Sequence, residues 1–342
     1  MNFVDDKSIL ITGGTGSFGN KFVERLFENH DPKKVIILSR DEFKQYQMKK
    51  KFPKEEYPMR YFIGNIREKD RLYRAFEGVD IVIHAAALKQ VPVAERNPFE
   101  AVKTNVLGAQ NIVDAAIDKG VEKIVGLSTD KAVNPINLYG ATKLVLEKTF
   151  VAGNSYVGER DTTFSMVRYG NVAGSRGSVI PFFMKLAEEG KEELPITDPR
   201  MTRFWITLEQ AVDLVLFALE ESVGGEVFVP KVPSMKITDL AEVICPGYEE
   251  NVIGIRPGEK IHENLISKSE ARNSVIYEGD EDEMTKYVIL PQFTFETKNL
   301  EKWKDLPGLP DGFEYNSGEN DEWLSKEELR EMIEDLDFEN KR

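Results

Sequence analysis

Short apolar, β-branched runs alternate with longer helical patterns through residues 1–170 of the chain. The apolar runs predict strands, and the patterns between them predict helices. The expected strands are 9–12, 35–39, 60–63, 81–84, 123–128 and 164–169, and the expected helices are 18–27, 43–50, 70–76, 98–118 and 138–151. Such alternation predicts an α/β fold in which helices cover both faces of a parallel sheet, the doubly wound arrangement of dinucleotide-binding domains.

Beyond residue 170 the pattern becomes irregular, because glycines and prolines interrupt short elements. We expect a helix at 208–220 and shorter elements near 227–229, 238–244 and 252–255. An acidic surface loop is expected at 278–283, and the Ser325-x-x-Glu328 spacing predicts a capping box that opens a last helix reaching about residue 336. We therefore predict a dinucleotide-binding domain at 1–170 and a smaller C-terminal substrate-binding lobe with a tail at 171–342, with some segments crossing between the two.

A glycine-rich sequence, Thr12-Gly-Gly-Thr-Gly-Ser-Phe-Gly19, follows the first expected strand and opens the first expected helix. Gly13 permits a tight turn, Gly16 lets the backbone approach a pyrophosphate, and Gly19 allows the helix and the sheet to pack closely. The N-terminus of the helix also favours an anion. The motif therefore predicts a dinucleotide cofactor bound by Gly13, Thr15, Gly16, Ser17, Phe18 and Gly19.

The end of the second expected strand bears on the choice between NAD and NADP. An NAD-binding domain places an acid there, on the ribose 2′-hydroxyl. This chain has Ser39 and Arg40, with Lys44 one helical turn further on, and a hydroxyl with two cations suits a 2′-phosphate. NADP is therefore favoured, but Asp41 leaves NAD open, since a shift of one residue would put a carboxylate at that position.

The next two strand ends are also expected to contact the cofactor. Asn65 and Ile66 follow the third strand, where adenine is usually held. Ala85 and Ala86 follow the fourth strand, where small side chains let the cofactor lie close to the backbone. We interpret His84, which precedes them, as a structural histidine rather than a catalyst.

Reactive side chains cluster at residues 128–143. Tyr139 and Lys143 are spaced to share one helix face, so the ammonium can lower the pKa of the phenol. A tyrosine tuned in this way can take a proton from an alcohol while a nicotinamide takes the hydride. Asp130 and Lys131 are not needed for that step, which indicates a further step after the oxidation.

Composition narrows the classes of partner. The 342 residues are 41% hydrophobic and 30% charged, as expected of a globular protein of about two domains. A net charge of −14 disfavours nucleic acid or an anionic membrane as the main partner, and no apolar run has the length of a membrane helix, so we expect a cytoplasmic protein. The single cysteine, Cys245, excludes an internal disulfide, and the three scattered histidines give no reason to expect a metal site.

Several longer motifs carry a resemblance to a known family. They are His84-Ala-Ala-Ala-Leu-Lys89-Gln-Val-Pro, Ser128-Thr-Asp-Lys-Ala, Asn134-Pro-Ile-Asn-Leu-Tyr-Gly-Ala-Thr-Lys, Tyr169-Gly-Asn-Val-Ala-Gly-Ser-Arg-Gly-Ser, Met201-Thr-Arg-Phe-Trp and Arg256-Pro-Gly-Glu-Lys. With these motifs the chain resembles the extended short-chain dehydrogenase/reductases that act on nucleotide sugars. Within them it is most similar to the inverting UDP-N-acetylglucosamine 4,6-dehydratases, which begin pseudaminic acid synthesis. The resemblance covers about residues 5–266.

The resemblance implies roles for the matching residues. Tyr139 and Lys143 would carry the oxidation at C4, Thr129 would aid the C4 hydroxyl, and Asp130 and Lys131 would act at C6 and C5. The implied UDP-sugar-binding residues are Lys89, Asn171, Thr197, Arg203, Arg256 and Glu259, and the cofactor site gains Lys89, Tyr139, Lys143 and Tyr169. The family also implies a homo-oligomer and a tightly bound NADP that is regenerated in each turnover. One departure is Asn65, where many relatives carry aspartate.

The implied elimination makes opposite demands on Asp130 and Lys131. Asp130 can protonate the departing C6 hydroxyl only if it holds a proton, which a poorly solvated site favours. Lys131 can take the C5 proton only as a neutral amine, which desolvation and nearby positive charge would favour. Relatives that retain the C5 configuration generally carry glutamate where Lys131 stands, so the resemblance implies inversion at C5.

Two rival functions share parts of this pattern. A UDP-N-acetylhexosamine 4-epimerase uses the same tyrosine and lysine but has no use for Asp130 or Lys131. A non-catalytic NADP-sensing module would keep the cofactor site, but it would not need the proton-transfer pair Tyr139 and Lys143.

Overall fold

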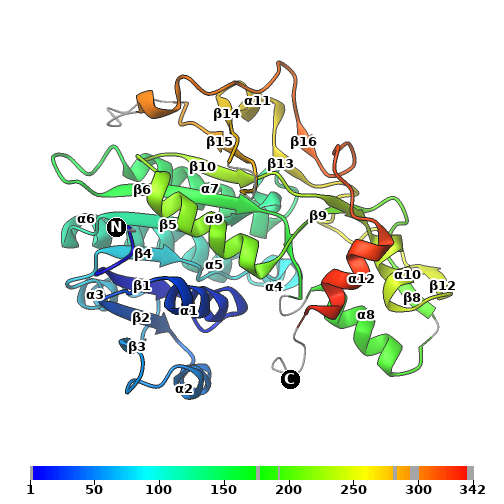
Figure 1. Ribbon diagram of the computed structural model, residues 1–342, viewed down its shortest axis with the longest axis horizontal. Coiled ribbons are helices and arrows are strands. Elements are labelled where there is room, and N and C mark those ends of the chain that lie inside the picture. The colour runs from blue at the N-terminus through cyan, green and yellow to red at the C-terminus, as the bar shows by residue number, and fades with distance from the viewer. Residues whose placement is uncertain (1–2, 175–177, 192, 280–282, 293–299, 337–342) are drawn as a thin grey trace.

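A nine-stranded sheet forms the centre of the computed structural model, which describes residues 3–174, 178–191, 193–279, 283–292 and 300–336 (Figure 1). The strand order is β14-β15-β10-β6-β5-β4-β1-β2-β3, parallel from β10 to β3 and antiparallel at β15 and β14. Their bounds are β1 Ser8–Thr12, β2 Lys34–Ser39, β3 Met59–Ile63, β4 Ile81–His84, β5 Lys123–Thr129, β6 Thr163–Tyr169, β10 Val227–Pro230, β14 Ser274–Tyr277 and β15 Lys286–Ile289. The predicted parallel sheet is confirmed, and each of its six predicted strands is found to within one residue at either end.

Helices cover both faces of this sheet. Those around it are α1 Ser17–Asn29, α2 Glu42–Lys51, α3 Lys69–Ala75, α4 Val91–Arg96, α5 Pro98–Ala101, α6 Gly108–Lys119, α7 Leu138–Gly153 and α9 Leu208–Glu221. On one face α1 packs against α9, and on the other α6 packs between α3 and α7. Strands β1 and β4 are buried along their whole length, as expected for the centre of a doubly wound sheet.

The single helix predicted at 98–118 is interrupted. A π-helical turn, η1 Val102–Leu107, separates α5 from α6. Within it the buried Asn105 side chain donates to the Leu88 carbonyl and the Thr142 hydroxyl and accepts from the Leu88 N–H. Single π-helical turns inside α-helices are frequently found at functional sites. Here the turn places Asn105 so that its hydrogen bonds link α7 to the loop after β4.

A second, smaller body lies beside the carboxyl ends of the strands (Figure 1). Its strands are β7 Asn171–Val172, β8 Glu193–Ile196, β9 Thr202–Ile206, β11 Ser234–Lys236 and β12 Glu249–Val252, and its helices are α8 Val179–Glu188, α10 Ile237–Ile244 and α12 Lys326–Glu334. It has its own apolar core, which includes Ile180, Phe183, Trp205, Leu240 and Leu329. The remaining elements are β13 Asn264–Ile266, α11 Lys268–Ala271, η3 Leu300–Trp303 and β16 Tyr315–Asn316.

Two boundaries expected in this half need correction. The short element expected near 252–255 lies earlier, as strand β12 at Glu249–Val252, where it pairs with β8. The predicted capping box is confirmed at Ser325 and Glu328, but α12 ends at Glu334. The loop expected at 278–283 falls partly outside the described residues. Strands β10, β14 and β15 come after residue 170 and still extend the large sheet, so the second half of the chain contributes to both bodies. No helix in the described ranges is both long and apolar enough to cross a membrane.

Candidate active site

The predicted catalytic residues meet where β5 ends. Thr129 is the last residue of β5, and a short 3-10 helix, η2 Asp130–Ala132, follows it directly. Helix α7 begins at Leu138, and Asn137 caps it by accepting from the Gly140 N–H at 2.8 Å. A Cβ at position 140 would lie 2.0 Å from the Lys131 carbonyl oxygen, so only glycine allows α7 to lie against η2. This close approach brings Tyr139 to residues 129–131, which we call the catalytic turn.

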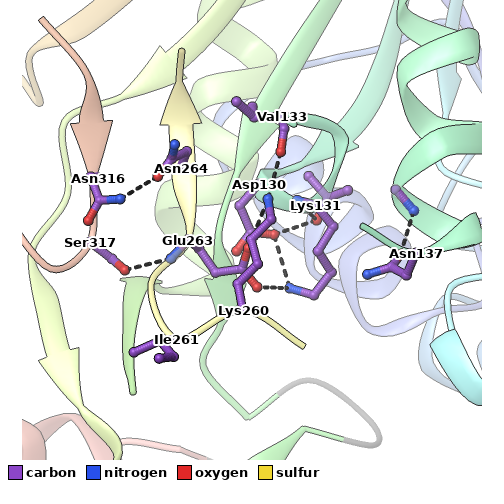
Figure 2. Close-up of polar contacts among 12 residues, drawn as sticks. Asp130, Lys131, Val133, Asn137, Lys260, Ile261, Glu263, Asn264, Asn316 and Ser317 are labelled. Atoms are coloured by element: carbon purple, nitrogen blue, oxygen red, sulfur yellow. Dashed lines mark hydrogen bonds and ion pairs between the residues drawn. The ribbon is translucent and has the colours of Figure 1, made fainter. Parts of the chain in front are cut away.

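Asp130 is fully buried, and its two carboxyl oxygens have different surroundings. Oδ1 accepts hydrogen bonds from Thr129 Oγ1 at 2.7 Å and from Lys131 Nζ at 3.1 Å, and Figure 2 shows Asp130 and Lys131 side by side. Oδ2 is buried and has no hydrogen-bond partner among the described residues. Because buried polar atoms are normally satisfied, this oxygen is available to a ligand group. A protonated Asp130 could donate from it, as the acid role requires.

Lys131 does not have the surroundings that the sequence suggested. Its ammonium lies 3.1 Å from Asp130 Oδ1 and 3.5 Å from Glu263 Oε1, and 26% of its side chain is exposed. Burial by itself lowers the pKa of Lys131, but the Asp130 and Glu263 carboxylates outweigh it and raise the pKa above its ordinary value. Arg203 opposes them more weakly. The expectation that desolvation and positive charge would make this amine neutral is therefore wrong for this structure, because a second carboxylate comes from a distant part of the chain.

The oxidation pair also differs from expectation. Burial raises the pKa of Tyr139 to about 12, and Lys131 and a hydrogen bond with Thr129 oppose that rise. Lys143 donates to the Leu127 carbonyl at 2.5 Å, and burial lowers its own pKa to about 8. The spacing correctly places both residues on α7, but Lys131, not Lys143, is the cation that lowers the pKa of the phenol here.

Two charged residues of the site were missed by sequence reasoning. Glu263 is only 3% exposed, and Lys260 Nζ lies 3.7 Å from its Oε2 and donates to the Val133 carbonyl at 2.6 Å. Both belong to residues 256–263, which we call the cover segment, and Asn137 ties this segment to the start of α7 through the Gly258 carbonyl at 2.8 Å. The Arg-Pro-Gly-Glu-Lys motif drew attention to the segment, but nothing distinguishes Glu263 among the 59 acidic residues of the sequence.

The glycine loop after β1 has the geometry that a pyrophosphate needs. Gly13 has a φ of +67°, and a Cβ there would lie 2.8 Å from the Ala86 Cα, so the loops after β1 and β4 touch through their backbones. Helix α1 begins at Ser17 and its N-cap, Gly16, makes no side-chain hydrogen bond to it. The N-terminal amides of a long helix therefore face the loop without a side-chain cap, which fits an anionic ligand.

At the end of β2, Ser39, Arg40 and Asp41, which bear on the choice between NAD and NADP, have different surroundings. Asp41 caps α2, accepting from the Lys44 N–H at 3.0 Å, and its other oxygen lies 3.5 Å from Lys44 Nζ. Arg40 is exposed, and the Ser39 hydroxyl is buried and accepts from Gln45 at 3.1 Å. Asp41 is therefore engaged at a helix N-terminus, and Arg40 is a cation of this strand end that faces solvent.

The other residues assigned to the cofactor lie at neighbouring strand ends. Ile66 is buried, Asn65 accepts from the Arg67 N–H at 3.1 Å, and Tyr169 is the buried last residue of β6. His84 is buried at the end of β4 and hydrogen-bonded to the Thr12 hydroxyl at 2.8 Å. Burial lowers the pKa of His84 to about 3, which keeps it neutral and agrees with a structural role. Ala85, Ala86 and Lys89 follow it in the loop that continues to α4.

The predicted sugar-binding residues are distributed over both bodies. Asn171 Oδ1 and Glu259 Oε2 are buried without hydrogen-bond partners in the described ranges, so each can serve a ligand. Arg203 donates to the Thr202 and Ile261 carbonyls at 2.6 and 3.0 Å, so it supports the cover segment. Arg256 is 58% exposed and 4.0 Å from Glu259, and Thr197 follows β8. Across the described residues, no group of three or more His, Cys, Asp or Glu side chains could hold a metal ion.

Comparison with known proteins gives matches along nearly the whole chain. A family model described as polysaccharide biosynthesis protein matches residues 9–281. A UDP-N-acetylglucosamine 4,6-dehydratase (inverting) from Campylobacter jejuni is 52% identical over 332 residues, which cover 96% of this chain and 97% of that protein. A UDP-glucose 4-epimerase from Rickettsia felis is 41% identical over 344 residues, covering 97% of each.

Solved structures share the same architecture. The X-ray structure of Pen from Bacillus thuringiensis superposes with a TM-score of 0.86 at 37% identity, covering 97% of this chain and 98% of that one. A dTDP-glucose 4,6-dehydratase from Streptomyces venezuelae with NAD bound gives a TM-score of 0.66 at 22% identity, covering 74% of this chain and 86% of that one. At the latter identity the likeness concerns the fold alone.

Proposed function

The chain belongs to the polysaccharide biosynthesis protein family, an extended short-chain dehydrogenase/reductase family, and we propose that it is a UDP-N-acetylglucosamine 4,6-dehydratase that inverts C5. Its product is UDP-2-acetamido-2,6-dideoxy-L-arabino-hex-4-ulose. One observation carries the assignment: the closely packed η2 and α7 bring an acid and an amine, Asp130 and Lys131, to the oxidising Tyr139. An enzyme that only oxidises and reduces C4 has no use for that acid and amine.

The cofactor is a nicotinamide dinucleotide, and we propose that it is NADP. The glycine loop and the start of α1 would hold its pyrophosphate, and Arg40 with Lys44 would face the 2′-phosphate. The engagement of Asp41 as the α2 cap supports this choice, because its Oδ1 already accepts from the Lys44 N–H. Such a cofactor supplies hydride acceptance at C4 and hydride return at C6, so net redox change is zero.

Oxidation at C4 needs a group that takes the hydroxyl proton. Tyr139 has this role in the proposal, with Thr129 next to it as the hydroxyl that holds the C4 oxygen. Because burial holds the pKa of Tyr139 near 12, the phenol needs cations to release its proton near neutral pH. Lys131 already supplies one, and Lys143, whose pKa is near 8, can supply another.

Elimination then uses Asp130 and Lys131 as a pair. The raised pKa of Lys131 favours its ammonium form, whereas the reaction needs a neutral amine and a carboxylic acid. An ammonium beside a carboxylate differs from an amine beside a carboxylic acid only in the position of one proton, held by Lys131 Nζ or by the Asp130 carboxyl group, so the net charge of the pair does not change. One proton transfer therefore prepares both the acid for the C6 hydroxyl and the base for the C5 proton.

The rival function is a 4-epimerase, and relatives with that name are also similar to the chain. Incubation with UDP-N-acetylglucosamine in D₂O, followed by NMR, separates the two. We expect a 4-keto-6-deoxy product with deuterium at C5 and the L-arabino configuration. Formation of only the galacto epimer, without deuterium at C5, would overturn the proposal. A protein that binds NADP and transforms no sugar would instead favour the sensing module.

We also propose a homo-oligomer, on the basis of the family resemblance. Light scattering of the purified protein tests it, and a mass near the 38.9 kDa of one chain at micromolar concentration would contradict it.

A further inference from the structure

Glu263 enters the catalytic site from a part of the chain far from the catalytic turn. Its backbone is held on both sides, since its N–H donates to Ser317 Oγ at 2.9 Å and its carbonyl accepts from the Ser317 N–H at 2.8 Å. Figure 2 shows the Glu263 side chain extending from this anchored backbone toward Lys131 and Lys260. The carboxylate is thus placed by the fold, not by the catalytic turn itself.

The Glu263 carboxylate faces two ammonium groups. Oε1 lies 3.5 Å from Lys131 Nζ, and Oε2 lies 3.7 Å from Lys260 Nζ. Glu263 is 3% exposed, and Oε2 has no hydrogen-bond partner within the described residues. With Asp130 the four groups form two acids and two cations. A buried carboxylate normally keeps its charge only when paired in this way.

In the proposed elimination, the charge on Lys131 depends on Glu263. Once Asp130 holds a proton, Glu263 is the remaining carboxylate that these contacts bring to the amine. When the C5–H bond breaks, its electron pair stays on C5 and is delocalised into the C4 ketone, and the proton moves to Lys131. The ammonium formed then needs an anion nearby, and Glu263 supplies it at 3.5 Å.

We propose that Glu263 is a positioning residue that holds the Lys131 amine toward C5 of the sugar and stabilises the ammonium formed there. This inference rests on the proposed dehydratase function. Lys260 has the opposite influence on Lys131, because the two ammonium groups compete for the Glu263 carboxylate. Lys260 is itself held in place because it donates to the Val133 carbonyl. Through Glu263 and Lys260, the cover segment therefore influences the chemistry at the catalytic turn.

The sign of the effect follows from the charges around Lys131. The groups that face it are Asp130, Glu263 and Tyr139, with Arg203 as a further cation. Loss of the Glu263 charge makes the ammonium less favourable, so Lys131 gives up its proton at lower pH and becomes a weaker base. Loss of the Lys260 charge leaves Glu263 free to favour the ammonium, so the same limb moves to higher pH.

The experiment compares Glu263→Gln with wild type by the pH dependence of kcat for dehydration. We expect the acidic limb to move down by about one pH unit, as nearby charges of this kind do. We expect kcat at the optimum to fall about tenfold with KM changed less than about twofold, because a general base of lower pKa is less effective. Glu263→Asp keeps the charge and should restore the wild-type limb. Glu314→Gln is the matched control, since Glu314 bonds Asn264 in the same region without facing Lys131.

If Glu263→Gln fails to fold, the pH profile of a second variant tests the same inference. Lys260→Met should move the acidic limb in the opposite direction, to higher pH. Limbs that stay at the wild-type pH in both folded variants would overturn the inference, as would a Glu263→Gln profile equal to that of Glu314→Gln. Wild-type protein that incorporates no deuterium at C5 would instead overturn the dehydratase function, so the two failures are distinguishable.

Discussion

The glycine loop after β1 and the catalytic turn after β5 both lie at the carboxyl edge of the large sheet, yet they are built differently. The glycine loop depends on shape: its backbone touches that of Ala86, and burial lowers the pKa of His84, which is hydrogen-bonded to Thr12, to about 3 and keeps it neutral. The catalytic turn depends on charge, with Asp130 and Lys131 balanced by Glu263 and Lys260. Side-chain size should therefore matter most at the glycine loop, and charge at the catalytic turn.

The largest expected effect is at the charged region. Lys131→Met removes the base and should lower kcat for dehydration by about 10²- to 10⁴-fold, as loss of a general base typically does. Deuterium incorporation at C5 should fall in parallel, while NADP affinity measured by fluorescence stays unchanged. Lys148→Met, an exposed lysine on α7, is the control. Unchanged C5 exchange in Lys131→Met would show that another group is the base.

At the shape-dependent region, Gly13→Ala should weaken NADP binding by about tenfold or more, because the new Cβ would lie 2.8 Å from the Ala86 Cα and the positive φ is strained. Gly120→Ala is a matched control, since Gly120 has the same φ of +67° and no atom within 4 Å of its Cβ position. Both variants should lose some thermal stability, but only Gly13→Ala should lose cofactor affinity. Equal affinities in the two variants would contradict the role of shape.

Arg40→Ser tests whether charge matters at one point of the cofactor site. The substitution should weaken NADP binding about tenfold and leave NAD binding unchanged, since only NADP has a 2′-phosphate that can accept a charge-assisted hydrogen bond from Arg40. Arg74→Ser, an exposed change on α3, should alter neither affinity. Equal losses for both cofactors on Arg40→Ser would remove the assignment of NADP.

The smallest effect concerns His84. Its pKa falls from 6.5 to about 3 on burial, so the unfolded chain binds a proton that the folded protein does not take up between these values. Stability from this residue is therefore present above pH 6.5 and lost as pH falls toward 3. The melting temperature of wild type should drop more steeply between pH 6.5 and about 4 than that of His84→Gln. Parallel curves would mean that His84 takes up its proton at the same pH in the folded and in the unfolded protein, contrary to a lowered pKa.

The two regions also differ in how far the sequence alone describes them. The glycine motif lies directly between β1 and α1, so its turn, the start of the helix and the anion site could be predicted from the local sequence alone. The Tyr139 and Lys143 spacing likewise places both side chains on α7. The state of Lys131 could not be predicted, because it depends on Glu263, which is 132 residues further along the chain and is brought in by the pairing around Ser317. The π turn at Asn105 was missed for the same reason, since its partners lie in two other segments.

In the proposed reaction, Asp130 and Lys131 act on adjacent carbons of one hexose. A crystal structure with NADP and UDP-N-acetylglucosamine is the direct test. We expect the C4 hydroxyl at Tyr139, the C6 oxygen within about 3.2 Å of an Asp130 carboxyl oxygen, and C5 within about 3.5 Å of Lys131 Nζ, the distances that proton transfer requires. A sugar whose C4 contacts Tyr139 while C5 and C6 lie away from both groups would contradict it.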